Sequence, residues 1–197
     1  MIALITVSIS AIGGILLGLP SAYFGGWTDM LVMRGVDIML SFPYILLTLA
    51  VVAMLGPSLT NAMIAIGVAG MPGYARLARS QILSVREEDF VTAARSVGAD
   101  DLRIMVAHVL PNVLSTLLVY ITLQAPGTLL SAAALSFLGL GAQPPMPEWG
   151  AMMVNSRTFL ASAPWAVLAP GLTIFAVILG LNVFGNALRD VLDPRVG

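Results

Sequence analysis

Residues 109–147 read VLPNVLSTLLVYITLQAPGTLLSAAALSFLGLGAQPPMP and contain no charged side chain. A membrane has a hydrocarbon core about 30 Å thick, which a helix of about 20 apolar residues crosses. Similar charge-free stretches lie at 1–28, 38–75 and 158–188, and Gly-Pro-Ser at 56–58 interrupts the second of them. We therefore predict an all-α fold, a polytopic transmembrane helical bundle with spans at 2–24, 38–55, 59–77, 107–131 and 166–186.

The composition agrees with a membrane protein and excludes several other classes. Of the 197 residues, 58% are hydrophobic and 10% are charged, whereas soluble domains carry about 25% charged residues. A net charge of -1 gives no support for a nucleic-acid partner. The absence of cysteine excludes a disulfide framework and thiolate chemistry.

The basic residues predict the orientation. All are arginine apart from one histidine; eight arginines follow the first, third and fifth predicted spans, and only Arg157 lies on the other side. The positive-inside rule places the arginine-rich side and the C-terminus in the cytoplasm, and Met1 outside. The charged residues of the first turn, Asp29, Arg34 and Asp37, are interpreted as interfacial anchors.

The N-terminal segment is interpreted as a span rather than a signal peptide, because it lacks a basic region and its apolar run is longer than usual. An external N-terminus without basic flanks is awkward to insert. We expect that a further helix precedes the chain; the alternative is a five-span protein with its N-terminus outside. The glycines between Gly13 and Gly18 are expected to face other helices, since small residues mark helix contacts in membranes.

The longest polar stretch lies between the third and fourth predicted spans. Ser84 to Glu87 matches a capping box, and acidic residues after it suit the start of a helix. Gly98 stands where that helix ends, as a C′ glycine does, and Asp100 or Asp101 is placed to cap a second helix that runs into the membrane. The first helix carries an apolar stripe formed by Phe90, Ala93, Ala94 and Val97.

Two interpretations of this short helix remain open. It lies on lipid headgroups or on its own bundle, or it docks a cytoplasmic partner. A membrane-surface helix favours Trp, Phe or Leu with basic residues opposite. The small pair Ala93-Ala94 suits insertion into a groove of another protein.

Several motifs resemble one family of transporters. Thr92–Gly98 (TAARSVG) followed by His108–Asn112 (HVLPN) resembles the EAA loop of binding-protein-dependent ABC importer permeases. The stretches at 135–141 (LSFLGLG), 144–150 (PPMPEWG) and 187–195 (ALRDVLDPR) are similar to the C-type inner-membrane subunit of the dipeptide, oligopeptide and nickel branch, as is YFGGW at 23–27. The resemblance runs from about Leu16 to Arg195.

This resemblance implies a single permease domain at 1–197, with five spans of a six-span fold and the first span absent. It implies an ATPase-coupling loop at 84–111, although the signature glutamate is Thr92 here. It also implies an external segment that faces a binding protein or the outer gate, for which the alternative is an interfacial loop. The expected coupling residues are Glu87, Glu88, Phe90, Thr92, Ala93, Ala94, Arg95, Gly98, Leu110 and Pro111. The expected external residues are Gly139, Gly141, Pro145, Glu148 and Trp149.

The resemblance further implies a bacterial or archaeal cell membrane and three kinds of protein partner. These are a homologous permease subunit, two cytoplasmic ATP-binding cassette subunits and an extracytoplasmic solute-binding protein. The chain has no lysine for a phosphate-binding loop, so ATP and Mg²⁺ are expected on the ATPase subunits. One histidine and no cysteine cannot form a conventional zinc site. The solute is expected to be a di- or oligopeptide or a related molecule such as a nickel chelate or glutathione, and its binding residues are not assigned.

Two other functions fit the sequence less well. An intramembrane protease needs a serine beside a general base, which a chain with His108 alone and no Gly-x-Ser-x-Gly elbow does not favour. A secondary transporter fragment is disfavoured by the lack of carboxylates within the predicted spans, because proton-coupled carriers use them.

Overall fold

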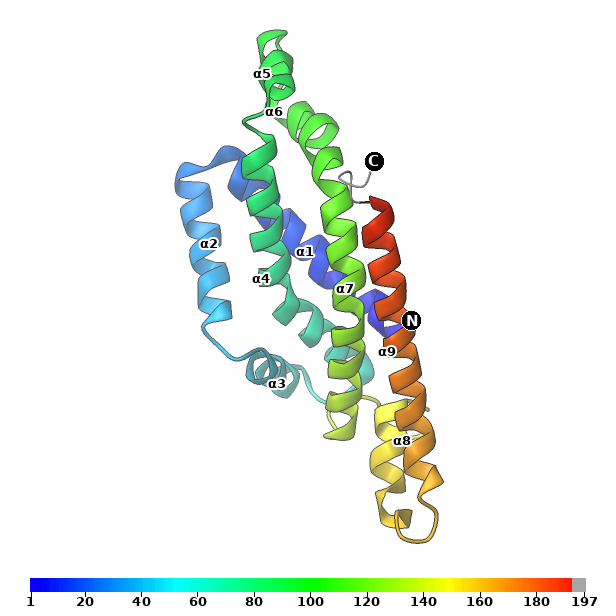
Figure 1. Ribbon diagram of the computed structural model, residues 1–197. Coiled ribbons are helices and arrows are strands. Elements are labelled where there is room, and N and C mark those ends of the chain that lie inside the picture. The colour runs from blue at the N-terminus through cyan, green and yellow to red at the C-terminus, as the bar shows by residue number, and fades with distance from the viewer. Residues whose placement is uncertain (193–197) are drawn as a thin grey trace.

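The computed structural model describes residues 1–192, and every regular element in that range is a helix (Figure 1). Residues 193–197, which include the predicted cytoplasmic Arg195, lie outside the described residues. The elements are α1 (Ile2–Phe24), α2 (Gly26–Leu40), α3 (Tyr44–Leu55), α4 (Leu59–Val85), α5 (Asp89–Ser96), α6 (Asp101–Arg103), the π-helix η1 (Ile104–Val109), α7 (Leu110–Phe137), α8 (Trp149–Ser156), the 3-10 helix η2 (Arg157–Phe159) and α9 (Trp165–Leu192).

Within residues 1–192, three helical segments are long and apolar enough to cross a membrane: α1, the continuous segment Asp101–Phe137, and α9. They confirm the predicted spans at 2–24, 107–131 and 166–186, the second of which is longer than expected. The predicted span at 59–77 is part of α4, which does not meet the same criterion of length and composition. α4 carries many buried residues, so neighbouring helices rather than lipid cover much of it.

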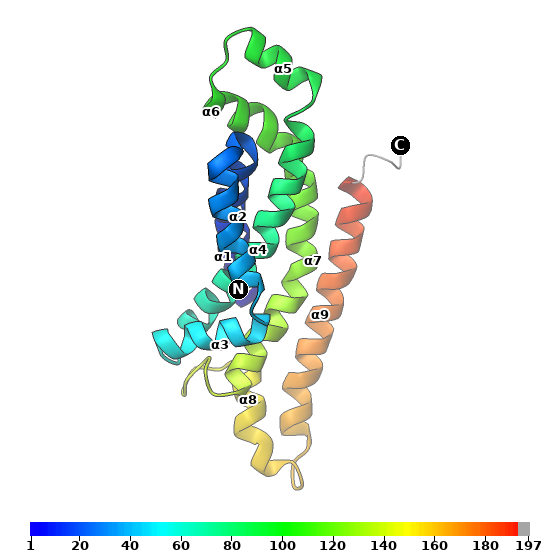
Figure 2. The same ribbon diagram turned by 90° about the vertical axis from the view of Figure 1, so that its left-hand side faces the viewer.

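The predicted span at 38–55 is not one continuous helix. Residues 26–40 and 44–55 form two helices bent by 94°, which together would count as one broken span. Pro43 is the N-cap of α3, and proline disfavours helical geometry in the residue before it. The first helix therefore ends at Leu40, and Figure 2 shows α3 lying across the bundle.

Glycine brings α1 and α4 close together, as predicted for the segment from Gly13 to Gly18. A Cβ atom on Gly18 would lie 2.5 Å from the backbone oxygen of Ala75, and one on Gly14 would collide with Tyr74. The two backbones approach so closely because these positions have no side chain. This contact of small residues holds the first long helix against the interior helix.

The ends of the bundle carry different elements. Figures 1 and 2 show α5 and α6 at one end and α8 at the other, and α9 runs back from α8 toward the α5 end. The turn between α1 and α2 lies near α5, while α3 lies toward α8 (Figure 1). The arginine-rich 76–103 segment therefore lies at the end of the bundle opposite Arg157, as the predicted topology requires.

Candidate functional site

The helix of the polar segment begins later than its sequence indicates. Ser84 belongs to the last turn of α4, which continues to Val85, so the predicted capping box at 84–87 is wrong. The N–H of Arg86 still donates to the carbonyl of Ile82 at 2.9 Å and completes that turn. Glu88 is the N-cap of α5 but makes no side-chain cap, and Asp89 lies in the first turn, where its charge favours the helix dipole.

The end of α5 is a Schellman motif built on Gly98. Its φ of +84° confirms the predicted left-handed glycine. The N–H of Gly98 donates to the carbonyl of Arg95 at 3.0 Å, and the N–H of Ala99 donates to that of Ala94 at 3.2 Å. These are the two bonds that define the motif, which commonly includes an apolar contact across the turn. Ala94 and Ala99 both pack against one cluster of buried apolar residues.

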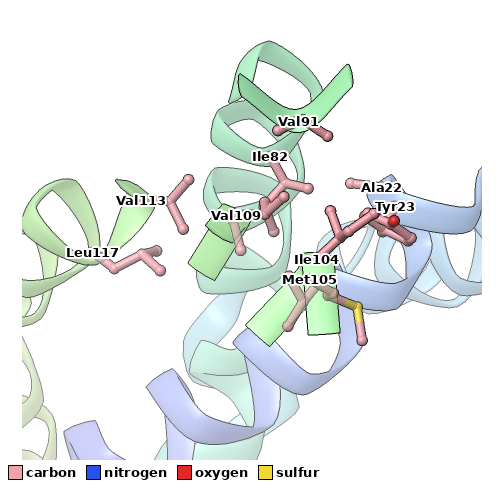
Figure 3. Packing of buried hydrophobic residues seen from close by; sticks show 11 residues of the cluster. Ala22, Tyr23, Ile82, Val91, Ile104, Met105, Val109, Val113 and Leu117 are labelled. Atoms are coloured by element: carbon pink, nitrogen blue, oxygen red, sulfur yellow. The ribbon is translucent and has the colours of Figure 1, made fainter. Parts of the chain in front are cut away.

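This buried cluster fastens α5 to the bundle. We call it the end cluster, and Figure 3 shows how residues from α1, α4, α5, η1 and α7 gather in it. Val91 is its contribution from α5 and is fully buried. The members are Leu19, Ala22, Tyr23, Ala78, Ile82, Val91, Ile104, Met105, Val109, Val113 and Leu117.

The predicted apolar stripe of α5 is divided between two faces. Ala94 is partly buried and packs against the end cluster, whereas Phe90 and Val97 are 40% and 85% exposed. Ala93 is exposed as well. Burial of Val91 was not predicted, because Phe90, Ala93 and Val97 also recur at helical spacing and indicate a different face of the helix. The outcome is a helix held by Val91 and Ala94 on one side, with Phe90, Ala93 and the C-cap residue Val97 exposed on the adjoining side.

The second helix enters the bundle through a widened turn. Asp100 is the N-cap of α6 but forms no side-chain cap, whereas Asp101 accepts a hydrogen bond from the Tyr23 hydroxyl at 2.8 Å. The π-helix at 104–109 lies directly before Pro111. Proline cannot donate to the preceding turn and clashes with its carbonyl, which accounts for the wide turn. Leu110 packs partly on the end cluster, and Pro111 is exposed.

The remaining predicted coupling residues lie on the solvent side. Glu87, Glu88 and Thr92 are partly or largely exposed. Arg95 is exposed, and its pKa is raised above the usual value, chiefly by hydrogen bonding to the Tyr23 hydroxyl. Arg95 on α5 and Asp101 on α6 thus line one pocket together with Tyr23 at the end of α1.

Ion pairs join the α1–α2 region to α4, and sequence reasoning missed them. Arg79 donates to both carboxylate oxygens of Asp29 at 2.6 Å, and Ser21 donates to the same carboxylate at 2.6 Å. Arg76 pairs with Asp37, also at 2.6 Å. The two aspartates are therefore not merely interfacial anchors. The opposite charges of the two segments were the available signal.

The predicted external residues lie at the junction of α7 and α8. Glu148 is 7% exposed, and its carboxylate caps α8 by accepting the N–H of Ala151 at 2.9 Å. Trp149 is half-buried, and Gly141 is packed against Ser136. Gly139 has a φ of +79°, and Pro145 is exposed. Glu148 therefore has a structural role, and Pro145 presents the open surface.

The two groups of predicted site residues lie at opposite ends of the bundle, as Figure 1 shows. Within residues 1–192, no three His, Cys, Asp or Glu side chains come together as a metal site would require.

Known proteins resemble this chain in sequence and in fold. It is 54% identical over 183 residues to the dipeptide transport system permease protein DppC of Alkalihalophilus pseudofirmus, covering 93% of this chain and 60% of that protein. It is 47% identical over 196 residues to the di/tripeptide transport system permease protein DppC of Pseudomonas aeruginosa, covering 100% and 65%. It is 45% identical over 174 residues to the glutathione transport system permease protein GsiD of Escherichia coli, covering 88% and 57%. The chain thus spans about three fifths of the length of these relatives.

The fold also occurs in a solved transporter. A chain of the inward-facing MetNI methionine ABC transporter superposes with a TM-score of 0.71 at 18% identity, covering 97% of this chain and 93% of that one. At this identity the likeness concerns the fold alone. The family described as binding-protein-dependent transport system inner membrane component matches residues 14–197, and the chain therefore belongs to that family.

Proposed function

We propose that this chain is the membrane-spanning permease subunit of an ATP-driven importer of short peptides. The outer face of α5 carries this proposal. Phe90, Ala93 and Val97 form an apolar surface on a helix of eight residues. A helix so short is marginal by itself, and this one is fixed to the bundle through Val91 and Ala94 on an adjoining side.

The attachment of α5 supplies a route for mechanical coupling. Val91 belongs to the end cluster, whose other members come from α1, α4, η1 and α7, and Tyr23 connects the end of α1 to Asp101. A partner that moves α5 would therefore move the ends of several long helices with it. Rigid-body motion of packed helices is a common form of alternating access.

The remaining partners follow from the family. An ATP-binding cassette subunit would hold ATP and Mg²⁺ and press on α5, while a homologous permease would complete the pathway. An extracytoplasmic binding protein would deliver the solute at the α8 end. Short peptides are the proposed solute class because relatives carry names for dipeptide, di/tripeptide and glutathione transport.

This proposal orients α5 and the C-terminus toward the cytoplasm. A reporter fused after Gly197 is expected to read cytoplasmic, because the arginine-rich segments lie at that end. A reporter inserted at 161–163, between η2 and α9, is expected to read external. The same reading from both positions would contradict the proposed orientation.

The docking face is tested with Ala93→Asp. A carboxylate on an apolar contact surface is costly to bury, so the purified complex is expected to lose its ATPase subunits and its peptide uptake. Asn155→Asp introduces the same charge at an exposed position of α8 and is expected to retain the ATPase. Ala94→Asp is a poorer test, since Ala94 packs within the chain. Full ATPase retention by Ala93→Asp, with normal uptake, would rule out docking through this face.

A further inference from the structure

A polar stripe runs along one face of the long α7 helix. Its members recur every three or four residues and so share a face, and Asn112, Thr116 and Gln124 are exposed in this chain. Polar side chains within a membrane face the bundle interior or a water-filled cavity. This face is therefore expected to line a hydrated path rather than contact lipid. The stripe comprises Asn112, Thr116, Tyr120, Gln124, Gly127 and Ser131.

Beside the C-terminal end of this stripe lies a cavity of about 210 Å³. α1, α3, α4 and α7 all contribute to its wall, and no charged residue lines it. Ser10, Tyr74 and Thr128 are buried, whereas Tyr44 and Gln124 are exposed at its rim. The lining residues are Ser10, Tyr44, Gly70, Tyr74, Gln124, Gly127, Thr128 and Ser131.

The hydroxyls of this cavity are not equivalent. Ser10 donates to the carbonyl of Gly67 at 2.8 Å, and Thr128 donates to that of Ala125 at 2.9 Å. Their donors are thus occupied, while lone pairs remain free to accept.

Tyr74 differs from both of them. It is 2% exposed, and its hydroxyl is the one buried side-chain polar atom within residues 1–192 that has no hydrogen-bond partner. Its ring lies edge-on to that of Tyr120, with centroids 4.9 Å apart. Buried polar groups are nearly always hydrogen-bonded, so we expect this hydroxyl to form a hydrogen bond with an atom from outside the chain.

We propose that this cavity is a solute-contact half-site that holds one uncharged peptide unit of the transported solute. The proposal rests on the proposed importer function. A peptide unit offers one donor and one acceptor, which match the free Tyr74 hydroxyl and the accepting lone pairs of Ser10 and Thr128. The lack of a charged lining residue disfavours the charged termini of a peptide as occupants.

The cavity is smaller than a complete binding site for a small molecule. Complete small-molecule pockets measure about 300–1,000 Å³, so this volume accommodates a portion of the solute. The remainder would lie against the α7 stripe and the facing permease subunit. A few neutral hydrogen bonds also suit transport, since a solute must bind weakly enough to leave.

The hydroxyl is tested with Tyr74→Phe in the importer purified with its partner subunits and reconstituted into vesicles. Uptake of a labelled dipeptide per ATP hydrolysed is expected to fall about fivefold, as for the loss of one hydrogen bond. ATP hydrolysis stimulated by the loaded binding protein is expected to stay unchanged, because α5 and the end cluster are untouched.

A matched pair of threonines provides the control. Thr128→Val removes a buried hydroxyl that lines the cavity, whereas Thr6→Val removes a buried hydroxyl that donates to its own helix away from the cavity. Only Thr128→Val is expected to lower uptake. If Tyr74→Phe and Thr128→Val transport like Thr6→Val while the wild type takes up dipeptide, the half-site is refuted and the importer function stands. A wild-type importer that takes up no short peptide overturns both.

Cysteine labelling gives a second, independent measurement. The chain has no cysteine, so Ser131→Cys at the cavity introduces its one thiol. A water-soluble thiol reagent is expected to modify Ser131→Cys, and excess dipeptide with loaded binding protein is expected to protect it. Thr6→Cys, sealed between helices, is expected to stay unmodified. Modification of Ser131→Cys without protection would show hydration alone, and absence of modification would show a closed cavity; either result overturns the proposal.

Discussion

Replacing Gly98 tests how tightly the position of α5 depends on one left-handed residue. A Cβ atom there would meet nothing within 4 Å, so the penalty comes from the backbone φ of +84° and not from a clash. An L-residue in this conformation costs about 1–2 kcal/mol, and a β-branched one up to about 3 kcal/mol. The strain is relieved by breaking the two Schellman hydrogen bonds and releasing the end of α5. For alanine the ratio of seated to displaced α5 is expected to fall about 5- to 30-fold.

Three substitutions at Gly98 give an ordered series. ATPase co-purification is expected to decrease from wild type through Gly98→Asn and Gly98→Ala to Gly98→Val, because asparagine tolerates the left-handed region best among them. Hydrogen exchange at residues 98 and 99 is expected to rise in the same order, since their amides donate the two bonds. Dipeptide uptake in reconstituted vesicles is expected to follow ATPase retention.

The control is another glycine with a positive φ, at the other end of the bundle. Gly56 has a φ of +90° and also has no atom within 4 Å of a built Cβ. Its ψ of 157° places it in a region that is essentially restricted to glycine, so Gly56→Val is expected to lower stability at least as much as Gly98→Val and yet to keep the ATPase bound. Wild-type exchange and full ATPase retention in Gly98→Val would refute the reasoning, and so would equal ATPase loss from both valine variants.

Two other contacts of the bundle yield predictions. Gly18→Val places a Cβ atom 2.5 Å from the backbone oxygen of Ala75 and is expected to destabilise the α1–α4 contact by about 1–3 kcal/mol. In Gly35→Val the added Cβ atom meets no neighbour, so this control is expected to have a far smaller effect. Equal thermal inactivation of the two variants in detergent would contradict this prediction. Tyr23→Phe loses the 2.8 Å hydrogen bond to Asp101 and is expected to cost about 1 kcal/mol. A double-mutant cycle with Asp101→Ala, which removes the accepting oxygen, checks it, since additive losses of thermal stability would mean that the bond contributes nothing.

Much of the coupling segment could be predicted from its residues. The turn at Gly98 depends on local chemistry, because a glycine at this position after an α-helix commonly adopts the left-handed conformation. Ser84 shows the limit of such reasoning. It has the right spacing to Glu87 for a capping box, yet α4 continues past it, since long-range packing extends a helix beyond its local stop signals.

The polar stripe of α7 was also present in the sequence. Asn112, Thr116, Tyr120 and Gln124 recur every four residues, but an uncharged stripe is easily overlooked in an apolar stretch. The cavity beside it could not be predicted. Ser10, Tyr44, Tyr74 and Thr128 come from four helices, and no spacing along the chain relates them.

The sequence by itself determined the membrane class, most of the long helices and the location of the exposed helix α5. These properties follow from charge-free length and from glycine, which act over a few turns of helix. Only the tertiary structure decided which side of α5 packs inward, how Asp29 meets Arg79, and that Tyr74 points into a cavity without a partner. The physical reason is that such choices depend on contacts between distant segments. A helical period marks the apolar positions of a helix, and the neighbouring helices then select which of them are buried.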